Sequence, residues 1–183
     1  DHIKFMIEYD PNNPYLNLWQ KGINNGKFKN YFINRFADVM NTSYLPDVLT
    51  SGENNIYQLV KPEMPKEYER WGDPNNVTGQ MISFIQNHST FKQQLAGRNE
   101  FVRQHLMNHF NLPNLVDVTL DIEPNNAGSV IISTLNPDDY PWQGLYFNGL
   151  PIKIEAVPAE NYAFVGWEKN DLIADTLNSI FTD

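Results

Sequence analysis

The sequence contains no cysteine, no run of basic residues and no long apolar run. The lack of cysteine excludes disulfides, thiolate metal sites and a cysteine nucleophile, although it does not fix the compartment. No stretch approaches the ~20 apolar residues that a membrane-spanning helix needs, so we expect no membrane span. No signal peptide is recognisable, and because the chain starts Asp-His-Ile we expect a trimmed segment of a larger protein.

Acidic residues outnumber basic ones, with 22 Asp and Glu against 13 Lys and Arg, for a formal net charge of -9. Nucleic acids and anionic membranes both require a basic face, so we expect neither as the main partner. The 183 residues are 41% hydrophobic and 13% aromatic, which is sufficient for a core in one domain or two small ones.

The most informative stretch is residues 27–41, which predicts an amphipathic helix. Its apolar residues recur at about four-residue spacing and form one wide stripe, which neighbouring helices should cover. They are Phe28, Tyr31, Phe32, Phe36, Val39 and Met40. The opposite side of this helix is polar. It carries Lys27, Asn30, Asn34, Asp38 and Asn41.

Further helices are expected up to Leu112. Thr42 or Ser43 can cap a helix that continues to Pro62, with a weak point at Gly52. A short helix restarts at Pro65, and residues 77–110 carry another apolar stripe with a break expected at Gly97. Because the connections are short, these helices predict an antiparallel bundle.

The apolar period changes from 3.6 to 2 after Pro113, which predicts strands. The expected strands cover residues 116–123, 128–134, 145–147, 152–156 and 162–167, and the tail at 172–181 can add one more. Residues 1–10 also alternate like a short strand. The sequence thus predicts an α+β protein with a helical domain at 1–113 and a small antiparallel β module at 114–183.

Two patterns could hold metals, and each has an ordinary alternative. His105 and His109 lie four residues apart on a helix, but the glutamate of a zincin motif and a third ligand are missing. The Pro-Asn-Asn turns starting at Asp10, Asp73 and Glu123 have calcium-type oxygens, yet they lack EF-hand spacing and suit turns and caps better.

Acidic clusters and charged residues beside apolar faces also have both a functional and an ordinary interpretation. Asp117, Asp121 and Glu123 share one strand face, where solvent exposure explains them. Asp138 and Asp139 lie near aromatic residues that can bind sugars, but such residues more often rim a small β core. Four charged residues beside apolar faces are expected to be partly buried pairing residues that fix helix packing, with a ligand-binding role as the alternative. They are Arg35 and Asp38 on the flank of the helix at 27–41, Arg70 and Arg98. The sequence therefore predicts no catalytic, cofactor-binding or metal-binding residue in this chain.

One resemblance covers about residues 20–112. This part resembles the late helical part of the CotH kinase family, the spore-coat protein H-like atypical kinases. The residues that carry it are Arg35-Phe-Ala-Asp38 with Asn41-Thr42, Pro62-Glu-Met-Pro65 with Arg70-Trp71, and Arg98 with Val102-Arg-Gln-His-Leu106. In that family the ATP and divalent-metal ligands lie upstream of these helices, and no residue here matches their acidic motifs.

The second half resembles the divergent internalin-B-type bacterial repeat, a small extracellular β unit. The best mark is Tyr162-x-Phe-x-Gly166-Trp167, supported by Tyr140-Pro-Trp142 and Pro151-Ile-x-Ile. By this resemblance Phe164 and Trp167 should supply most of the module's core.

Together the resemblances imply a fragment of a secreted or surface-attached bacterial protein, with a spore-coat location included. Its helices would buttress a kinase site in the upstream part of the same polypeptide. The alternatives are a non-catalytic adhesion module that contacts polysaccharide or protein, and a structural coat or envelope component.

Overall fold

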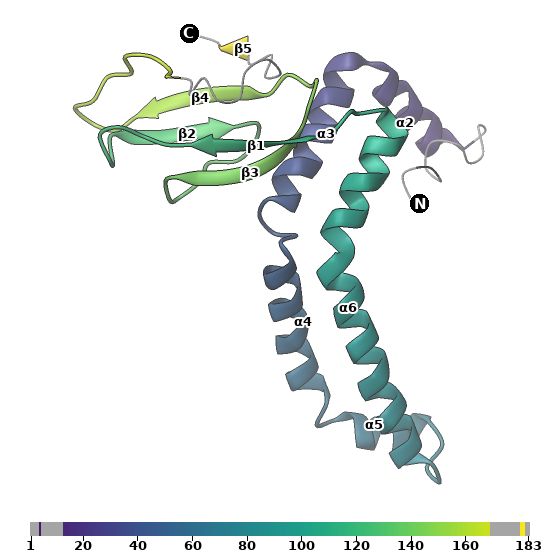
Figure 1. The fold of residues 1–183 in the computed structure, drawn as a ribbon. Helices are drawn as coiled ribbons and strands as arrows, with labels where there is room; N and C mark the ends of the chain where they lie inside the picture. Colours follow the sequence, from purple (N-terminus) through teal and green to yellow (C-terminus); the bar gives the residue numbers. More distant parts are fainter. Residues whose placement is uncertain (1–3, 5–12, 169–179, 182–183) are drawn as a thin grey trace. The chain divides into compact units, whose positions relative to one another are not determined.

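The computed structural model describes residue 4, residues 13–168 and residues 180–181. It shows a mixed α+β protein in which helices come first along the chain and strands follow (Figure 1). The predicted mixed class is therefore correct. The strand expected at residues 1–10 lies outside the described residues.

Five helices precede the strands: α2 (Pro14–Asn24), α3 (Gly26–Met40), α4 (Pro46–Val60), α5 (Met64–Trp71) and α6 (Val77–Phe110). Asparagine side chains cap the N-termini of α2 and α3. Asn13 accepts hydrogen bonds from the backbone of Tyr15 and Leu16, and Asn25 accepts one from Phe28. These are ordinary N-caps, since each satisfies amides that lack a partner in the first turn.

The predicted helix at 27–41 is confirmed as α3, and α4 and α6 run unbroken across Gly52 and Gly97. The capping expectation was wrong. Leu45 occupies the N-cap of α4 without a side-chain bond, so neither Thr42 nor Ser43 caps it. Pro14 to Asn24 form helix α2.

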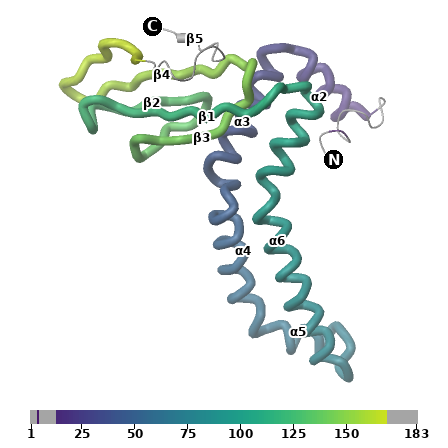
Figure 2. Tube along the Cα trace, viewed as in Figure 1, coloured from purple at the N-terminus to yellow at the C-terminus, as the bar shows by residue number. Residues whose placement is uncertain are grey.

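The strands are β1 (Leu115–Leu120), β2 (Gly128–Ile132), β3 (Trp142–Phe147), β4 (Lys153–Pro158) and β5 (Ile180–Phe181). β1 pairs antiparallel with β3, and β2 pairs antiparallel with β4. The two residues of β5 pair with β4 in parallel. The tube in Figure 2 shows β1 to β4 gathered in one region of the fold.

The expected strand at 162–167 is not formed, and its residues do not supply the β core. Phe164 is 47% exposed, and Trp167 packs against its ring in a surface segment. The buried apolar side chains come instead from the paired strands and the segment before β4. They are Val118, Leu120, Val130, Ile132, Tyr146, Phe147, Leu150, Ile152 and Ile154.

Contacts divide the chain into two compact units. The first joins the residues up to Asn41 with those from Arg103 onward, and the second comprises Thr42–Val102. α2, α3 and the end of α6 thus belong with the strands. The first unit extends across the boundary that the sequence placed at 113/114, because α3 packs on β3.

An aromatic cluster holds the helices of the first unit together. The rings of Trp19 and Phe32 lie 4.5 Å apart edge to face, and Phe32 also contacts Phe36 at 4.8 Å and Phe110 at 6.3 Å. Edge-to-face packing of this kind adds to the stabilisation by burial alone. The apolar stripe of α3 is therefore covered in part by α2 and the end of α6, while Phe28 and Tyr31 stay 39% and 58% exposed.

Gly128 lies where the backbones of β2 and β4 come close together. A Cβ at this position would collide with the backbone carbonyl of Val157, the residue before its cross-strand partner Pro158. We expect Gly128→Ala to lower the free energy of unfolding by about 1–3 kcal/mol, since the backbone must shift to admit the methyl group. Urea unfolding followed by circular dichroism measures this.

Gly26→Ala is the matched control, because nothing lies within 4 Å of a Cβ there. Equal effects of the two substitutions would show that Gly128 is not required by the close approach.

Candidate functional site

The polar side of α3 points into the strands instead of into solvent. Three residues of this side, Asn34, Asp38 and Asn41, are buried, Asp38 completely. The sequence predicted a partly buried, paired Asp38 but did not predict the burial of Asn34 and Asn41. All three are buried because a helix can pack on both sides, and here the second side meets strand edges that offer hydrogen-bonding groups. The three residues form the candidate site, which we call the polar junction.

Asp38 is held by three donors. Its carboxylate accepts hydrogen bonds from the Thr134 amide at 3.0 Å, the Thr134 hydroxyl at 2.6 Å and the Tyr146 hydroxyl at 2.8 Å. A buried carboxylate is tolerated only with such partners. Asp38 thereby fixes the turn after β2 and the centre of β3 to one point on α3.

The Asn41 side chain forms hydrogen bonds with the backbone at the edge of β3, as a neighbouring strand would. Its Oδ1 accepts from the Leu145 amide and its Nδ2 donates to the Leu145 carbonyl, both at 3.0 Å. Gly144 allows the approach, because a Cβ there would lie 2.8 Å from Asn41 Nδ2 and would also collide with the Trp142 ring. An exposed edge strand invites pairing with other chains, and here a side-chain amide satisfies part of that edge.

Arg103 completes the polar junction from α6. Its guanidinium donates to Asn41 Oδ1 at 2.8 Å and to the Leu145 carbonyl at 3.0 Å, and the residue is only 6% exposed. Asn34 adds a fourth link by donating to the Pro151 carbonyl at 2.9 Å. All these contacts lie within the first compact unit.

Burial controls the protonation of the polar junction. It raises the pKa of Tyr146, and the negative charge and hydrogen bond of Asp38 raise it further. Burial also lowers the pKa of Arg103, an effect that the nearby Tyr146 opposes. The phenol therefore stays protonated and donates to Asp38.

The three arginines singled out in the sequence are exposed, so their expected partial burial was wrong. Arg35 donates to the Thr134 hydroxyl at 2.8 Å, and Arg70 lies 4.9 Å from the ring of the exposed Trp71. Arg103 has the role expected of them. The sequence contained a signal for the polar junction. Asn34, Asp38 and Asn41 are short polar residues at helical spacing, which suits them to short-range hydrogen bonds.

His105 and His109 lie one turn apart on α6, as expected. Within residues 13–168, no group of three or more His, Asp or Glu side chains is arranged to hold a metal ion. Asp73 accepts a hydrogen bond from the Asn75 amide, and Asn13 caps α2, so these two Pro-Asn-Asn segments act as turn and cap. Most of the first segment, residues 10–12, lies outside the described residues.

The acidic residues of the strand region are at the surface. Asp117 is exposed on β1, and Asp121 accepts from the next backbone amide. The aromatic residues near Asp138 face inward, because the Tyr140 hydroxyl bonds Val130 and Tyr146 is fully buried. Their hydroxyls are occupied within the fold, which disfavours a sugar site at Asp138.

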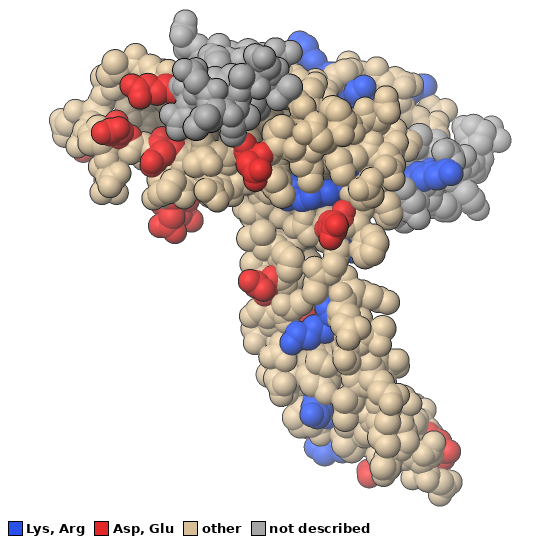
Figure 3. Space-filling view, viewed as in Figure 1, with Lys and Arg blue, Asp and Glu red and all other residues tan. Residues whose placement is uncertain are grey.

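Charge is unevenly distributed along the chain. Lys153 is the single base between residues 114 and 168, a stretch that contains Asp117, Asp121, Glu123, Asp138, Asp139, Glu155, Glu160 and Glu168. Figure 3 shows acidic side chains over the strands. Such a surface repels nucleic acid and anionic lipid. Among the helices of the described segments, none is long and apolar enough to span a membrane.

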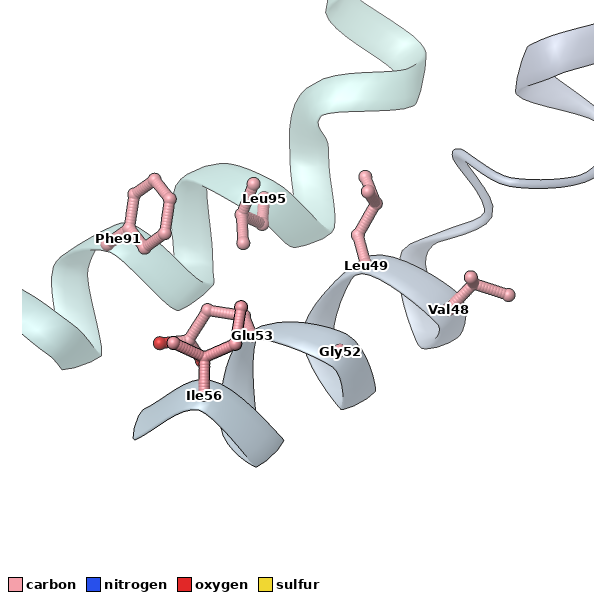
Figure 4. Close-up of a pocket in the computed structure, with 7 residues that line it drawn as sticks. All are labelled: Val48, Leu49, Gly52, Glu53, Ile56, Phe91 and Leu95. Carbon is pink, nitrogen blue, oxygen red and sulfur yellow. The ribbon is translucent and has the colours of Figure 1, made fainter. Parts of the chain in front are cut away.

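The second compact unit contains a polar contact between His88 of α6 and Glu53 of α4, which we call the clasp. His88 Nε2 lies 2.9 and 3.0 Å from the two carboxylate oxygens of Glu53. The His88 ring stacks on Tyr57 with centroids 3.4 Å apart, and Tyr57 stacks on Phe84 at 5.5 Å. Beside the clasp, Val48, Leu49, Gly52, Glu53, Ile56, Phe91 and Leu95 line an apolar groove of about 380 Å³ (Figure 4).

Comparison of the chain with family models, with curated proteins and with solved structures gave no match. The resemblances to CotH kinases and to the internalin-B-type repeat therefore stay predictions.

Asn41→Ala tests the polar junction. It removes the acceptor of the Leu145 amide, one of the two donors to the Leu145 carbonyl and one acceptor of the Arg103 guanidinium, so we expect a loss of about 2–4 kcal/mol in unfolding free energy. Asn108→Ala, at an exposed position bonded only to Gln104, should change it by less than about 0.5 kcal/mol. Equal effects in urea unfolding would contradict the edge-capping role.

Tyr146→Phe tests the contact with Asp38 through pH. The raised pKa of folded Tyr146 means that this stability is fully present below its unfolded pKa of about 10 and is lost as pH rises above it. At neutral pH we expect the variant to lose about 1–3 kcal/mol, because a buried carboxylate loses a donor.

The variant should also lose part of the decline in stability that the wild-type protein shows above about pH 10. Tyr31→Phe, at a 58% exposed tyrosine, should retain the wild-type pH profile. An unchanged alkaline profile in Tyr146→Phe would exclude Tyr146 as the titrating group.

Proposed function

We propose that the chain is a non-catalytic supporting module of a CotH-like bacterial surface protein. In this proposal α2 and α3 pack against an upstream segment that carries an atypical kinase site and hold it in position. The strand region is an attached repeat. ATP and a divalent metal would be bound upstream, by residues that this chain does not contain. The protein would act outside the cell or in the spore coat.

The observation that carries the proposal is the exposed apolar surface of α2 and α3. Tyr15 is 82% exposed, Leu18 73% and Tyr31 58%. Scattered exposed apolar residues are common, but three large ones on two adjacent short helices favour a covering partner. The CotH resemblance supplies that partner, namely the upstream part of the same polypeptide.

The polar junction supports a mechanical role. Asn34 and Arg103 donate hydrogen bonds to backbone carbonyls of the strand region, and Asp38 and Asn41 accept from its backbone amides. Among the described residues, Asn34 Oδ1 is the one buried side-chain atom of the junction that has no hydrogen-bond partner. A support that positions a catalytic segment must be rigid, and a buried network with nearly all its groups paired confers rigidity. The predicted bundle then forms when the helices of this chain pack with upstream helices.

The adhesion alternative rests on a different surface. Tyr162, Phe164 and Val165 are 50%, 47% and 99% exposed in the segment after β4. Exposed aromatic residues on an acidic β unit suit contact with polysaccharide or a protein partner. This role would be independent of nucleotide.

Thermal-shift titration with ATP and Mg²⁺ or Mn²⁺ separates the two functions. A ligand that binds the native state raises its melting temperature by mass action. We expect no shift in this chain, and a shift when it follows a kinase-like segment that carries the family's acidic motifs. A shift in this chain alone, or none in the longer polypeptide, would contradict the proposal.

Leu18→Asp tests whether an upstream part of the polypeptide covers the exposed apolar surface of α2. In this chain the substitution is on the surface and should change the unfolding free energy by less than about 0.5 kcal/mol. In the longer polypeptide it should lower stability by about 2 kcal/mol or more, because a carboxylate would enter an apolar contact. Val165→Asp is the control, and it should be neutral in both.

A further inference from the structure

Strand β1 has one edge that pairs with β3 and another edge that faces away from it. In an antiparallel pair, residues whose backbone groups bond the other strand alternate with residues whose groups point outward. Leu145 of β3 belongs to the outward set, because its amide and carbonyl bond the side chain of Asn41. Its cross-strand partner Asp117 therefore points outward on the other side, and so does Thr119 two residues later.

The outward backbone groups of Asp117 and Thr119 are unpaired. Among the described residues, no hydrogen bond reaches the amide or the carbonyl of either residue. Both residues are exposed. At the start of the strand the Leu115 carbonyl already accepts a hydrogen bond from Asn114 Nδ2. We call the two amides and two carbonyls of Asp117 and Thr119 the β1 edge.

The outer edges of the neighbouring strands are at least partly occupied. On β3, the side chains of Asn41 and Arg103 bond the backbone of Leu145. On β2, the Tyr140 hydroxyl accepts from the Val130 amide at 2.7 Å and donates to the Val130 carbonyl at 3.3 Å. β4 pairs with β5. Open edges are sites of strand pairing, so the β1 edge is the place where an additional strand fits best.

The charge at the β1 edge determines the sign of a suitable partner. Within the part of the chain that the structure describes, the Asp117 carboxylate has no ion-pair partner. Lys153, the one base between residues 114 and 168, lies 2.6 Å from Glu155. Opposite charges on facing residues of neighbouring strands stabilise the pair, and like charges destabilise it. An incoming strand is therefore favoured when it carries Lys or Arg opposite Asp117, and pairing between two copies of β1 is disfavoured.

We propose that the β1 edge binds an extended basic peptide segment of a partner protein, which adds a strand beside β1. The backbone of the segment bonds the four groups of the β1 edge, which is the interaction that gives affinity in strand addition. A basic side chain of the segment lies opposite Asp117, on the exposed face. The next residue projects to the side of Val118, which is 5% exposed, so an apolar residue suits that position. The recognised pattern is an alternation of basic and apolar residues.

This interaction does not depend on the supporting role proposed above, because it uses β1 and leaves α2 and α3 unchanged. It is also separate from the adhesion alternative, which uses the exposed residues after β4. A short segment makes few hydrogen bonds, and each replaces a bond to water. We therefore expect a dissociation constant on the order of 100 μM for an isolated peptide.

Amide hydrogen exchange followed by NMR tests the geometry of the β1 edge in the full chain. The amides of Asp117 and Thr119 should exchange faster than the amide of Val118, which belongs to the set that bonds β3. A peptide of alternating Lys and Val, at ten times its dissociation constant, should slow the exchange of both edge amides by about 10-fold. The Val118 amide is the internal control and should change little.

Three peptides distinguish strand addition from attraction between charges alone. The first alternates Lys and Val, the second has the same sequence with N-methyl groups on its lysine amides, and the third has Glu in place of Lys. Only the first should bind, because the second cannot donate to the β1 edge and the third is repelled. Equal binding by the second or third peptide, or no binding by the first at about 1 mM, would overturn the proposal.

Substitutions in the chain test the same contacts from the other side. Asp117→Asn should weaken binding of the Lys and Val peptide by about 2- to 5-fold, since one exposed ion pair is lost. Asp47→Asn is the matched control, because it makes the same change at an exposed position of α4. Thr119→Pro removes an outward donor while keeping the bonds to β3, and should weaken binding at least about 5-fold.

Circular dichroism checks that these variants keep their secondary structure, and the N-methylated peptide decides the question if Thr119→Pro does not fold. An affinity that neither Asp117→Asn nor Thr119→Pro changes would overturn the proposal. A second copy of the chain is the competing occupant of the β1 edge. Protection of the two edge amides that rises with protein concentration in the absence of peptide would show that pairing, and the proposal would then be wrong.

Discussion

The first compact unit depends on the hydrogen bonds between Asp38 and Asn41 on α3 and the backbone and side chains of β3 and the preceding turn. Desolvating these groups is unfavourable unless every partner is present. The pairing therefore permits one arrangement of helix and strands. Arg103, which begins the part of α6 in this unit, supplies the remaining donors.

The two sides of α3 act by different physical means. Its aromatic side packs against Trp19 and Phe110 through contacts that tolerate small shifts. Its polar side bonds to fixed backbone positions, such as both groups of Leu145. The polar side therefore holds α3 at fixed positions along β3.

The second compact unit is organised differently. Tyr57 is its only buried large apolar residue among those described, and the His88–Glu53 clasp is part-buried beside it. Two helices with a short third cannot cover their own apolar surfaces. Exposed Ile56, Leu59 and Phe91 follow from this, and they favour association with further helices.

The sequence by itself determined the helices and most strands, because apolar periodicity and the Asn and Pro residues that begin or end an element act on the local backbone. It predicted α3, α4 and α6 closely, and β1 from its alternation. It failed at 162–167, where aromatic residues predict a strand but no partner strand pairs with them. The sequence predicted pairing for Asp38 without its partners, and it could not assign Asn34 and Asn41, since polar residues on a helix suit solvent or a strand edge equally well. Only the tertiary structure decided which groups these residues bond, because their partners are distant in the chain: Thr134 and Leu145 come about 100 residues later.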